Sequence, residues 1–255
     1  MRFASLASGS SGNALVVEAD GTRLMLDCGL GPREVERRLA RRALAPADLA
    51  AIVLTHEHGD HADGALAFAR RHGLQVWMTY GTWRAIAADA VPAADVNIID
   101  SHRAFVVGAL EVHPFPVPHD AREPVQFVFS DGARRLGVLT DTGASTPHIE
   151  SMLSGCQALV LECNHDAGLL DRGPYPARLK ERIRGGYGHL ANDAAARLLA
   201  ALDRRSLQHV VAAHLSQQNN TAELARTALA GALGCGAEWI GVADQEDGFD
   251  WRALG

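Results

Sequence analysis

The sequence predicts an α/β fold, an αββα sandwich in which two mixed β-sheets pack together and helices cover their outer faces. Short β-rich segments and helical segments alternate along all 255 residues. Two blocks of similar composition follow one another, each with early strands and later helices, so each block would supply one sheet and its helices. No Pro/Ser-rich linker, repeat or low-complexity tract interrupts them, which favours a single domain over residues 1–255.

Strands are predicted where short apolar and β-branched runs lie between turn signals. Asp20-Gly21 is a strong hairpin signal between the second and third of them. The order of the strands in the sheets does not follow from the pattern. The predicted strands span residues 3–7, 14–19, 23–27, 51–55, 75–79, 96–99, 104–107, 110–117, 125–130, 135–140, 158–162, 210–213 and 237–242.

Helices are predicted where apolar residues recur with helical spacing. Asn192 and Thr221 are suitable N-caps, and Gly73 and Gly234 stand where helices should end. The predicted helices span residues 33–42, 64–72, 82–88, 147–153, 176–184, 192–203 and 221–233.

The composition limits the cellular setting and the partners. No apolar run approaches the roughly 20 residues that span a bilayer, and the first ten residues are too weakly charged and too briefly apolar for a secretory signal. Cysteines are scattered without CxxC pairs, which fits a reducing cytoplasm. We therefore expect a cytoplasmic protein with no membrane partner, and the oligomeric state stays open.

A net charge of −6 argues against nonspecific coating of nucleic acid, although a local basic segment exists. Between residues 172 and 184, Glu181 is the only acidic residue among several basic ones. Arginine offers a planar fork for phosphate oxygens, but a solvated helix face fits the segment equally well. Its basic residues are Arg172, Arg178, Lys180, Arg182 and Arg184.

The run from Thr55 to His61 carries the main chemical signal. It places three imidazoles and two carboxylates in six residues directly after the apolar segment 51–54. His56 and His58 share a face at a strand end, Gly59 permits a turn, and Asp60 and His61 follow at a helix start. A polar surface loop has no reason to gather imidazoles at this spacing. The run predicts a metal site, and its four potential ligands can serve two ions.

Three further candidates follow apolar β-like runs, where a rigid scaffold meets a variable loop. They are His119, Asp141 and His214. Together with the first run they give five imidazoles and two carboxylates. Mixed nitrogen and oxygen donors suit two divalent ions such as Zn²⁺ or Mn²⁺, and also Fe²⁺, better than Mg²⁺ or Ca²⁺.

The order HxHxDH followed by these three residues resembles the metallo-β-lactamase-fold hydrolases across nearly the whole chain. Several segments further resemble the bacterial YycJ-like (WalJ-like) exonuclease group, which is related to ribonuclease Z-type phosphodiesterases. HxHxDH is specific for the superfamily and says little about the substrate. The segments that resemble the subgroup span residues 5–13, 139–143, 161–166, 173–176, 188–190 and 213–220.

The resemblance implies an assignment of the ligands. One ion would be held by His56, His58 and His119, and the other by Asp60, His61 and His214. Asp141 would bridge both ions, and a hydroxide between them would attack phosphorus in line. Asp60 would also orient that hydroxide. Glu57 and Gly59 would be spacers, and the Asp of the segment 26–29 would support the metal loop.

Other polar residues are candidates for contact with the substrate. The setting of His189 resembles the His-Ser-Thr motif of ribonuclease Z, which implies that it binds a phosphate oxygen or protonates the leaving alkoxide; the alternative is a structural histidine. His165 either faces the same cleft or is structural. In the Gly/Ser loop 8–13, from Ser8 to Asn13, backbone amides either approach a substrate phosphate or form a tight strand connection. The histidines expected to be structural or exposed are His72, His102, His113, His148 and His209.

The leading functional hypothesis is a dinuclear metal-dependent phosphodiesterase, a nuclease that acts as a single-strand exonuclease on DNA or RNA. A thioester or lactone hydrolase of the glyoxalase II type would use the same ligands. Only His189 and the basic segment favour the phosphodiester. A regulatory protein without catalysis is disfavoured by the complete ligand set, and a secreted β-lactamase by the weak N-terminal signal.

Overall fold

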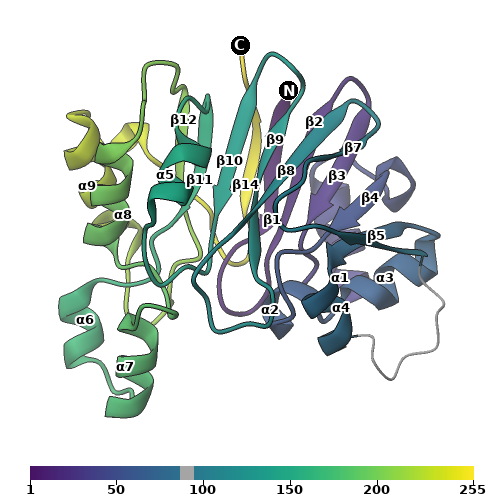
Figure 1. Cartoon of the computed structure of the whole chain (residues 1–255). Coiled ribbons are helices and arrows are strands. Elements are labelled where there is room, and N and C mark those ends of the chain that lie inside the picture. Colours follow the sequence, from purple (N-terminus) through teal and green to yellow (C-terminus); the bar gives the residue numbers. More distant parts are fainter. Residues whose placement is uncertain (87–94) are drawn as a thin grey trace.

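The computed structural model describes residues 1–86 and 95–255, and within them two β-sheets pack face to face between outer layers of helices (Figure 1). The predicted αββα sandwich is confirmed. Each sheet has seven strands among the described residues and contains both parallel and antiparallel neighbours.

The first sheet has the order β14-β1-β2-β3-β4-β5-β6. Neighbours from β14 to β3 run antiparallel, whereas β3, β4, β5 and β6 run parallel. The strands are β1 (Arg2–Ala7), β2 (Ala14–Ala19), β3 (Thr22–Leu26), β4 (Ala51–Val53), β5 (Gln75–Thr79), β6 (Asp95–Ile99) and β14 (Phe249–Ala253).

The second sheet has the order β13-β12-β11-β10-β9-β8-β7. Strands β10 to β13 run parallel, and β7 to β10 run antiparallel. The strands are β7 (Phe105–Val107), β8 (Leu110–Pro116), β9 (Val125–Ser130), β10 (Arg135–Leu139), β11 (Ala158–Glu162), β12 (His209–Ala213) and β13 (Gly241–Val242).

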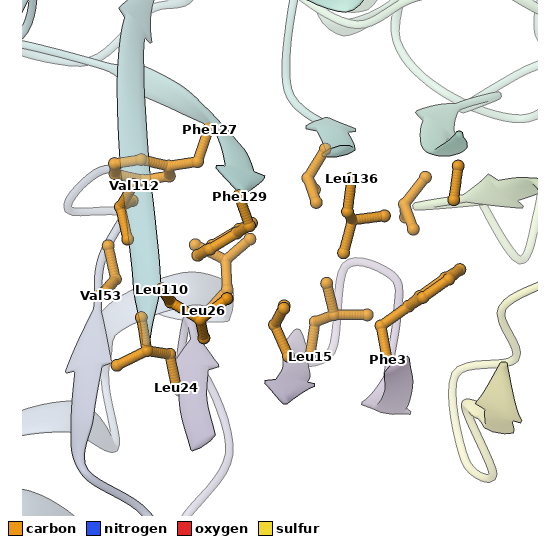
Figure 2. Close-up of a cluster of buried hydrophobic side chains, with 14 of the residues drawn as sticks. Phe3, Leu15, Leu24, Leu26, Val53, Leu110, Val112, Phe127, Phe129 and Leu136 are labelled. Carbon is orange, nitrogen blue, oxygen red and sulfur yellow. The ribbon is translucent and has the colours of Figure 1, made fainter. Parts of the chain in front are cut away.

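Alternation along the strands sends side chains to two different cores. Phe127 and Phe129 of β9 join the cluster between the sheets, as Leu24 of β3 does (Figure 2). Val128, between the two phenylalanines, lies on the other face, beneath the helices. Burial of each such large side chain contributes about 1.5–3 kcal/mol, so the sandwich supplies a rigid base for the loops at its edges.

Helices cover the outer face of each sheet (Figure 1). On the first sheet, Leu39 and Phe68 pack with Met25 in one cluster. On the second sheet, Leu198 and Leu229 pack on the opposite outer face. The helices of the first layer are α1 (Pro32–Arg41), α3 (Ala65–His72) and α4 (Tyr80–Ile86), and those of the second are α5 (Pro147–Leu153), α8 (Asn192–Ala201) and α9 (Ala222–Leu233).

Most predicted elements appear with shifts of one or two residues at their ends, and four predicted strands and one helix have the observed bounds. Residues 87 and 88 of the predicted helix 82–88 lie outside the described residues. Two helical elements and one strand were not predicted: η1 (Pro46–Asp48), α6 (Ala167–Arg172) and β14. Asp60 and His61, expected at the start of the next long helix, instead form a separate short helix, α2 (Gly59–Ala62). Helix α7 (Ala177–Arg184) was predicted one residue longer.

The prediction of a strand over 237–242 was wrong for its first half. Ala237–Trp239 forms a 3₁₀ helix, η2, because the Trp239 amide donates to the Gly236 carbonyl at 3.1 Å. Only β13 pairs with the sheet.

Three of the four predicted helix ends are confirmed. Thr221 accepts a hydrogen bond from the Leu224 amide, and Gly73 and Gly234 adopt left-handed conformations at C-caps. Asn192 as an N-cap was wrong: Ala191 holds that position. The Asn192 side chain instead exchanges two 2.8 Å hydrogen bonds with Asn220, which occupies the groups that a cap would need.

No helix within residues 1–86 and 95–255 is both long and apolar enough to cross a bilayer. The parallel strands of both sheets matter more for function, because loops that leave their carboxyl ends gather at one edge of the sandwich.

Candidate metal centre

The predicted ligands come from loops at this edge, between the two sheets. Strand β4 of the first sheet ends at Val53, just before the run from Thr55 to His61. In the second sheet, β10 ends at Leu139 and β12 at Ala213, so Asp141 and His214 follow directly. His119 lies in the connection between β8 and β9.

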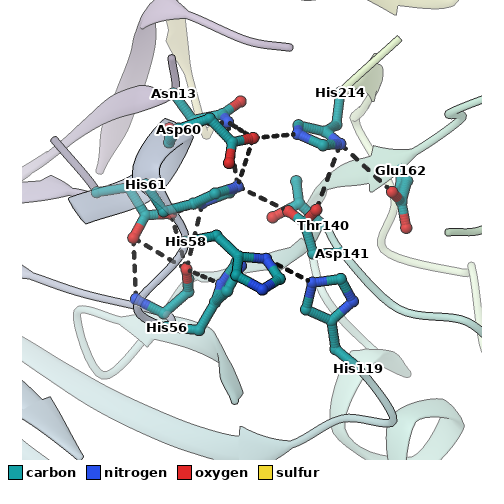
Figure 3. A network of polar contacts seen from close by, with 12 residues as sticks. Asn13, His56, His58, Asp60, His61, His119, Thr140, Asp141, Glu162 and His214 are labelled. Carbon is teal, nitrogen blue, oxygen red and sulfur yellow. Dashed lines mark hydrogen bonds and ion pairs between the residues drawn. The ribbon is translucent and has the colours of Figure 1, made fainter. Parts of the chain in front are cut away.

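The structure brings all seven predicted ligand side chains together (Figure 3). Four groups of side chains each have ligand atoms within 4.8 Å of one another. Three contain only predicted ligands, and two of these reproduce the predicted sets of three: His56, His58 and His119; Asp60, His61 and His214; and His56, His61 and Asp141. The fourth group joins Asp141 and His214 to Glu162 and His189.

In several of these histidines, Nδ1 contacts a protein group, and Nε2 is left to face the centre. Nδ1 of His61 donates to Asp27 Oδ2 at 2.8 Å. Nδ1 of His56 lies 3.0 Å from Thr55 Oγ1, and His56 Nε2 is buried without a hydrogen-bond partner among the described residues. An imidazole fixed in this way is the usual state of a metal-binding histidine.

The spacing of the nitrogens also fits a cation. Nδ1 of His119 donates to the Gly188 carbonyl at 3.1 Å, and its Nε2 lies 3.2 Å from His58 Nδ1. Ligands about 2.0–2.1 Å from a tetrahedral ion lie roughly 3.3 Å apart. The pair is therefore placed as two ligands of one ion would be.

The carboxylates supply negative charge at the same point. Asp141 is buried, and its Oδ2 lies 2.9 Å from His61 Nε2. Burial opposes ionisation of Asp141, but His214 and His61 outweigh it and hold its pKa well below the ordinary value. Burial lowers the pKa of His56 well below its ordinary value. His56 and Asp141 are thus in the forms that bind divalent cations. Burial alone would lower the pKa of His61 and His214, but carboxylates led by Asp141 outweigh it and raise both, so negative charge at the centre attracts cations. The donor set present fits a metal site.

Backbone strain concentrates at this site. Asp27, Asp141 and His214 have φ angles of 60°, 52° and 54°. Left-handed backbone is unfavourable for side chains other than glycine, and least so for Asp and Asn. The surrounding structure therefore holds these residues in place.

Asp27 supports the first loop, as the resemblance implied. Its Oδ1 accepts hydrogen bonds from the Thr55 amide at 2.9 Å and from Thr55 Oγ1 at 3.0 Å, while Oδ2 holds His61. Close to it, a Cβ on Gly29 would lie 1.9 Å from the Asp60 carbonyl oxygen. Only glycine lets the two segments approach so closely.

Replacing Asp27 with asparagine is expected to weaken metal affinity by about 10–100-fold, because an amide cannot fix the His61 ring as a carboxylate does. Titration of the stripped protein against a chelating indicator measures this. Asp20→Asn is the matched control, because Asp20 also has a positive φ, of 44°, but lies in the β2–β3 turn. Equal affinity of both variants would contradict a supporting role for Asp27.

His189 lies beside the centre, held by a carboxylate that was not predicted. Glu162, the fully buried last residue of β11, accepts a hydrogen bond from His189 Nδ1 at 2.8 Å. Its Oε2 accepts from the amides of Thr142 and Leu190 at 2.9 and 3.1 Å. Burial alone would lower the pKa of His189, but Glu162 outweighs it and raises that pKa.

Glu162 was missed because the search considered only histidine and aspartate after apolar runs. It directly follows the buried run 158–161. A carboxylate at the end of a fully buried strand is a signal in itself, because such a charge needs partners.

Ser8 and Asn13 lie behind the ligands, buried. Ser8 Oγ accepts a hydrogen bond from the His214 amide at 2.8 Å. Asn13 Nδ2 lies 3.1 Å from His61 Nε2 and 3.4 Å from Asp60 Oδ2. These inward contacts favour support of the ligands over the contact with substrate that we predicted.

Glu57 is more than a spacer, since its Oε1 accepts a hydrogen bond from the Arg122 amide at 2.8 Å. His165 is buried next to this edge of the sandwich. The remaining histidines make other contacts: His72 with Glu36 and His113 with Glu111, at 3.0 and 3.1 Å. None of the four groups of metal-ligand atoms around the centre includes His72, His102, His113, His148 or His209.

Two of the five basic residues in the segment 172–184 pair with acids. Arg182 pairs with Asp120 at 2.6 Å, and Arg184 with Asp171 at 2.5 Å. Lys180 Nζ donates to the Asp171 carbonyl at 2.8 Å. The solvated face is therefore the closer description of α7, except that Arg184 also lines a cavity beside His189.

Comparison with known proteins agrees with this geometry. The chain is 36% identical to exodeoxyribonuclease YycJ of Bacillus anthracis over 235 residues. This match covers 91% of this chain and 89% of that protein. The chain is 32% identical over 246 residues to exodeoxyribonuclease WalJ of Streptococcus pneumoniae, covering 94% and 91%. Zn²⁺-bound PqqB from Methylobacterium extorquens shares the fold over the full length of both chains, with a TM-score of 0.74 and 16% identity.

These similarities confirm both resemblances inferred from the motifs. The model of the β-lactamase superfamily domain matches residues 22–214, which include every candidate ligand. The chain therefore belongs to the β-lactamase superfamily.

Proposed function

We propose that the chain is a metal-dependent phosphodiesterase, an exonuclease that removes nucleotides from single-stranded nucleic acid. The observation that carries the proposal is the convergence of seven nitrogen and oxygen donors beside a histidine anchored on a buried glutamate. The two curated relatives, each 32% identical or more over most of the chain, are named exodeoxyribonucleases. This supports a phosphodiester substrate.

Two ions are proposed, Zn²⁺ or Mn²⁺, with Fe²⁺ as a further candidate for these donors. His56, His58 and His119 would hold one ion, and Asp60, His61 and His214 the other, with Asp141 shared. Divalent ions in such a pair supply an activated water and neutralise charge on the phosphate.

The protein's own groups would orient the reaction. Glu162 occupies His189 Nδ1, which leaves Nε2 to hold a proton for the departing alkoxide of the nucleic acid. Asp60 Oδ2 lies 3.2 Å from His214 Nε2, which holds its carboxylate in one orientation, and we propose that it orients the attacking water.

A thioester or lactone hydrolase is the alternative, because it would use the same ligands. A thioester is not favoured, because an alkoxide leaving group benefits from an acid such as His189 far more than a thiolate does. A lactone also expels an alkoxide, so this argument does not count against it. The names of both curated relatives stand against both substrates.

Removing the metal is expected to abolish hydrolysis, and refilling with Mn²⁺ or Zn²⁺ to restore it. The stripped and refilled proteins are compared on end-labelled single-stranded oligonucleotides and on a thioester. We expect mononucleotides to be released from the oligonucleotide in at least one metal form. Activity confined to the thioester would overturn the proposal.

A further inference from the structure

A cavity of about 280 Å³ opens beside the metal centre, and we call it the His165 cavity. His189 lines it and also belongs to the centre, where its Nδ1 lies 3.3 Å from Asp141 Oδ1. Gly143, two residues after Asp141, forms another part of the wall. A substrate at the metal centre would therefore extend directly into this cavity.

His165 is the polar group most clearly directed to a ligand. Its side chain is 2% exposed and lines the cavity. Nδ1 makes only a long contact of 3.4 Å with its neighbour Asn164. Among the described residues, no hydrogen bond involves Nε2, which is not one of the fully buried unpartnered atoms and so stays accessible. The backbone is fixed, because the His165 carbonyl accepts from the Asn192 amide at 2.9 Å. A rigidly held imidazole with an accessible nitrogen beside a cavity can exchange a hydrogen bond with a ligand there.

The charges around the cavity favour a neutral occupant over a terminal phosphate. Arg184 and Arg197 line it, but each is paired with an aspartate that lines it too, Asp171 at 2.5 Å and Asp193 at 2.6 Å. A dianion would face both carboxylates, whereas a nucleoside uses donors and acceptors together. Burial also lowers the pKa of His165, so its neutral ring offers one donor and one acceptor.

The remaining walls and the size fit one nucleoside. Leu170 of α6 and Ala194 of α8 give apolar surface for the face of a base. Ligand pockets usually measure about 300–1,000 Å³, so this cavity, at about 280 Å³, lies just below that range and suits a ligand the size of one nucleoside.

From these observations we propose that the His165 cavity binds the terminal nucleoside of the strand, with His165 as a hydrogen-bonding residue. The proposal rests on the phosphodiesterase function proposed above. It adds the reason for exonucleolytic action, because a cavity for one nucleoside places the scissile bond one nucleotide from the end.

Two variants alter the cavity by different means. Ala194→Phe fills it, and His165→Phe keeps a ring but removes both nitrogens. Ala200→Phe, on the exposed face of the same helix, is the matched control and should behave as the wild type. Ala194→Leu replaces the larger substitution if thermal unfolding shows that Ala194→Phe does not fold.

Each variant is assayed on an end-labelled single-stranded oligonucleotide and on bis(p-nitrophenyl) phosphate, which lacks a nucleoside. For both cavity variants, kcat/KM on the oligonucleotide divided by kcat/KM on bis(p-nitrophenyl) phosphate should fall at least about ten-fold. That is the size of effect expected for loss of a well-placed contact. Thymidine 5′- or 3′-monophosphate should inhibit the wild type more strongly than inorganic phosphate, and the variants should lose that difference.

The outcomes separate the two proposals. If the wild type degrades the oligonucleotide and the ratio does not change in the variants, the cavity does not bind the nucleoside, while the phosphodiesterase function stands. An equal loss of kcat/KM on both substrates would also overturn the cavity proposal, because it would show that the substituted residues support the metal centre. A wild type that hydrolyses neither phosphodiester would overturn the proposed function itself.

Discussion

Asp141→Asn is expected to reduce phosphodiester hydrolysis by at least about a thousand-fold and to lower the metal content. Asparagine has the same shape but lacks the charge that offsets the ions. Asp141 lies among both groups of histidines, and its buried carboxylate contacts His61 Nε2 at 2.9 Å and His214 Nδ1 at 3.5 Å. Loss of a shared ligand should exceed the roughly 10–100-fold effect of losing a supporting group. Steady-state kinetics and elemental analysis of the same preparation measure the two effects.

Asp120→Asn is the matched control. Asp120 adjoins His119, and its Oδ1 lies 3.6 Å from His119 Nε2, but it pairs with Arg182 and joins none of the four groups. We expect its activity to change by less than about ten-fold, as for a partly exposed charge. Similar losses of activity in Asp120→Asn and Asp141→Asn would mean that only the local negative charge matters. Asp141 would then not be a ligand shared by two ions.

His189→Ala is expected to retain its metal and to lose about 10²–10⁴-fold in turnover of oligonucleotides. The reason is the loss of a proton donor to the leaving alkoxide, since Glu162 fixes the ring by a 2.8 Å bond to Nδ1. On bis(p-nitrophenyl) phosphate the loss should be much smaller, because p-nitrophenolate leaves without protonation. Added imidazole should restore part of the oligonucleotide activity.

The surface histidine variant His148→Ala serves as the control for this experiment, and we expect wild-type turnover on both substrates. Equal losses for His189→Ala on the two substrates, without rescue by imidazole, would assign His189 a structural role instead. A lowered metal content would have the same meaning.

The sequence predicted which side chains meet at the candidate metal centre better than it predicted their surroundings. His56 to His61, His119, Asp141 and His214 could be found because a metal needs donor atoms of few kinds, at strand ends. Their meeting point depends on which strands are neighbours, and pairing over long distances leaves little trace in local composition. The strand order, and with it the relation of β4 to β10 and β12, came only from the structure.

The supporting residues were harder to predict, since their partners are distant in the sequence. Ser8 meets His214 across 206 residues, so nothing near Ser8 indicates an inward role. The same holds for Asn192, whose partner Asn220 takes the groups that an N-cap would use. Strand β14 was missed because it is an edge strand in which only Phe249 is buried, so its sequence lacks a clear alternation of apolar and polar residues. Glu162, by contrast, could have been found by extending the search to glutamate.

The left-handed backbone at Asp27, Asp141 and His214 has a consequence for how this protein is maintained. Such a conformation costs about 1–2 kcal/mol for an ordinary residue, and glycine would relieve it. At Asp141 and His214 the residue that would relieve this strain is thus not the residue that the proposed metal site needs, and at Asp27 it is not the residue that holds His61. A lineage that ceased to need the enzyme could gain stability by losing these side chains.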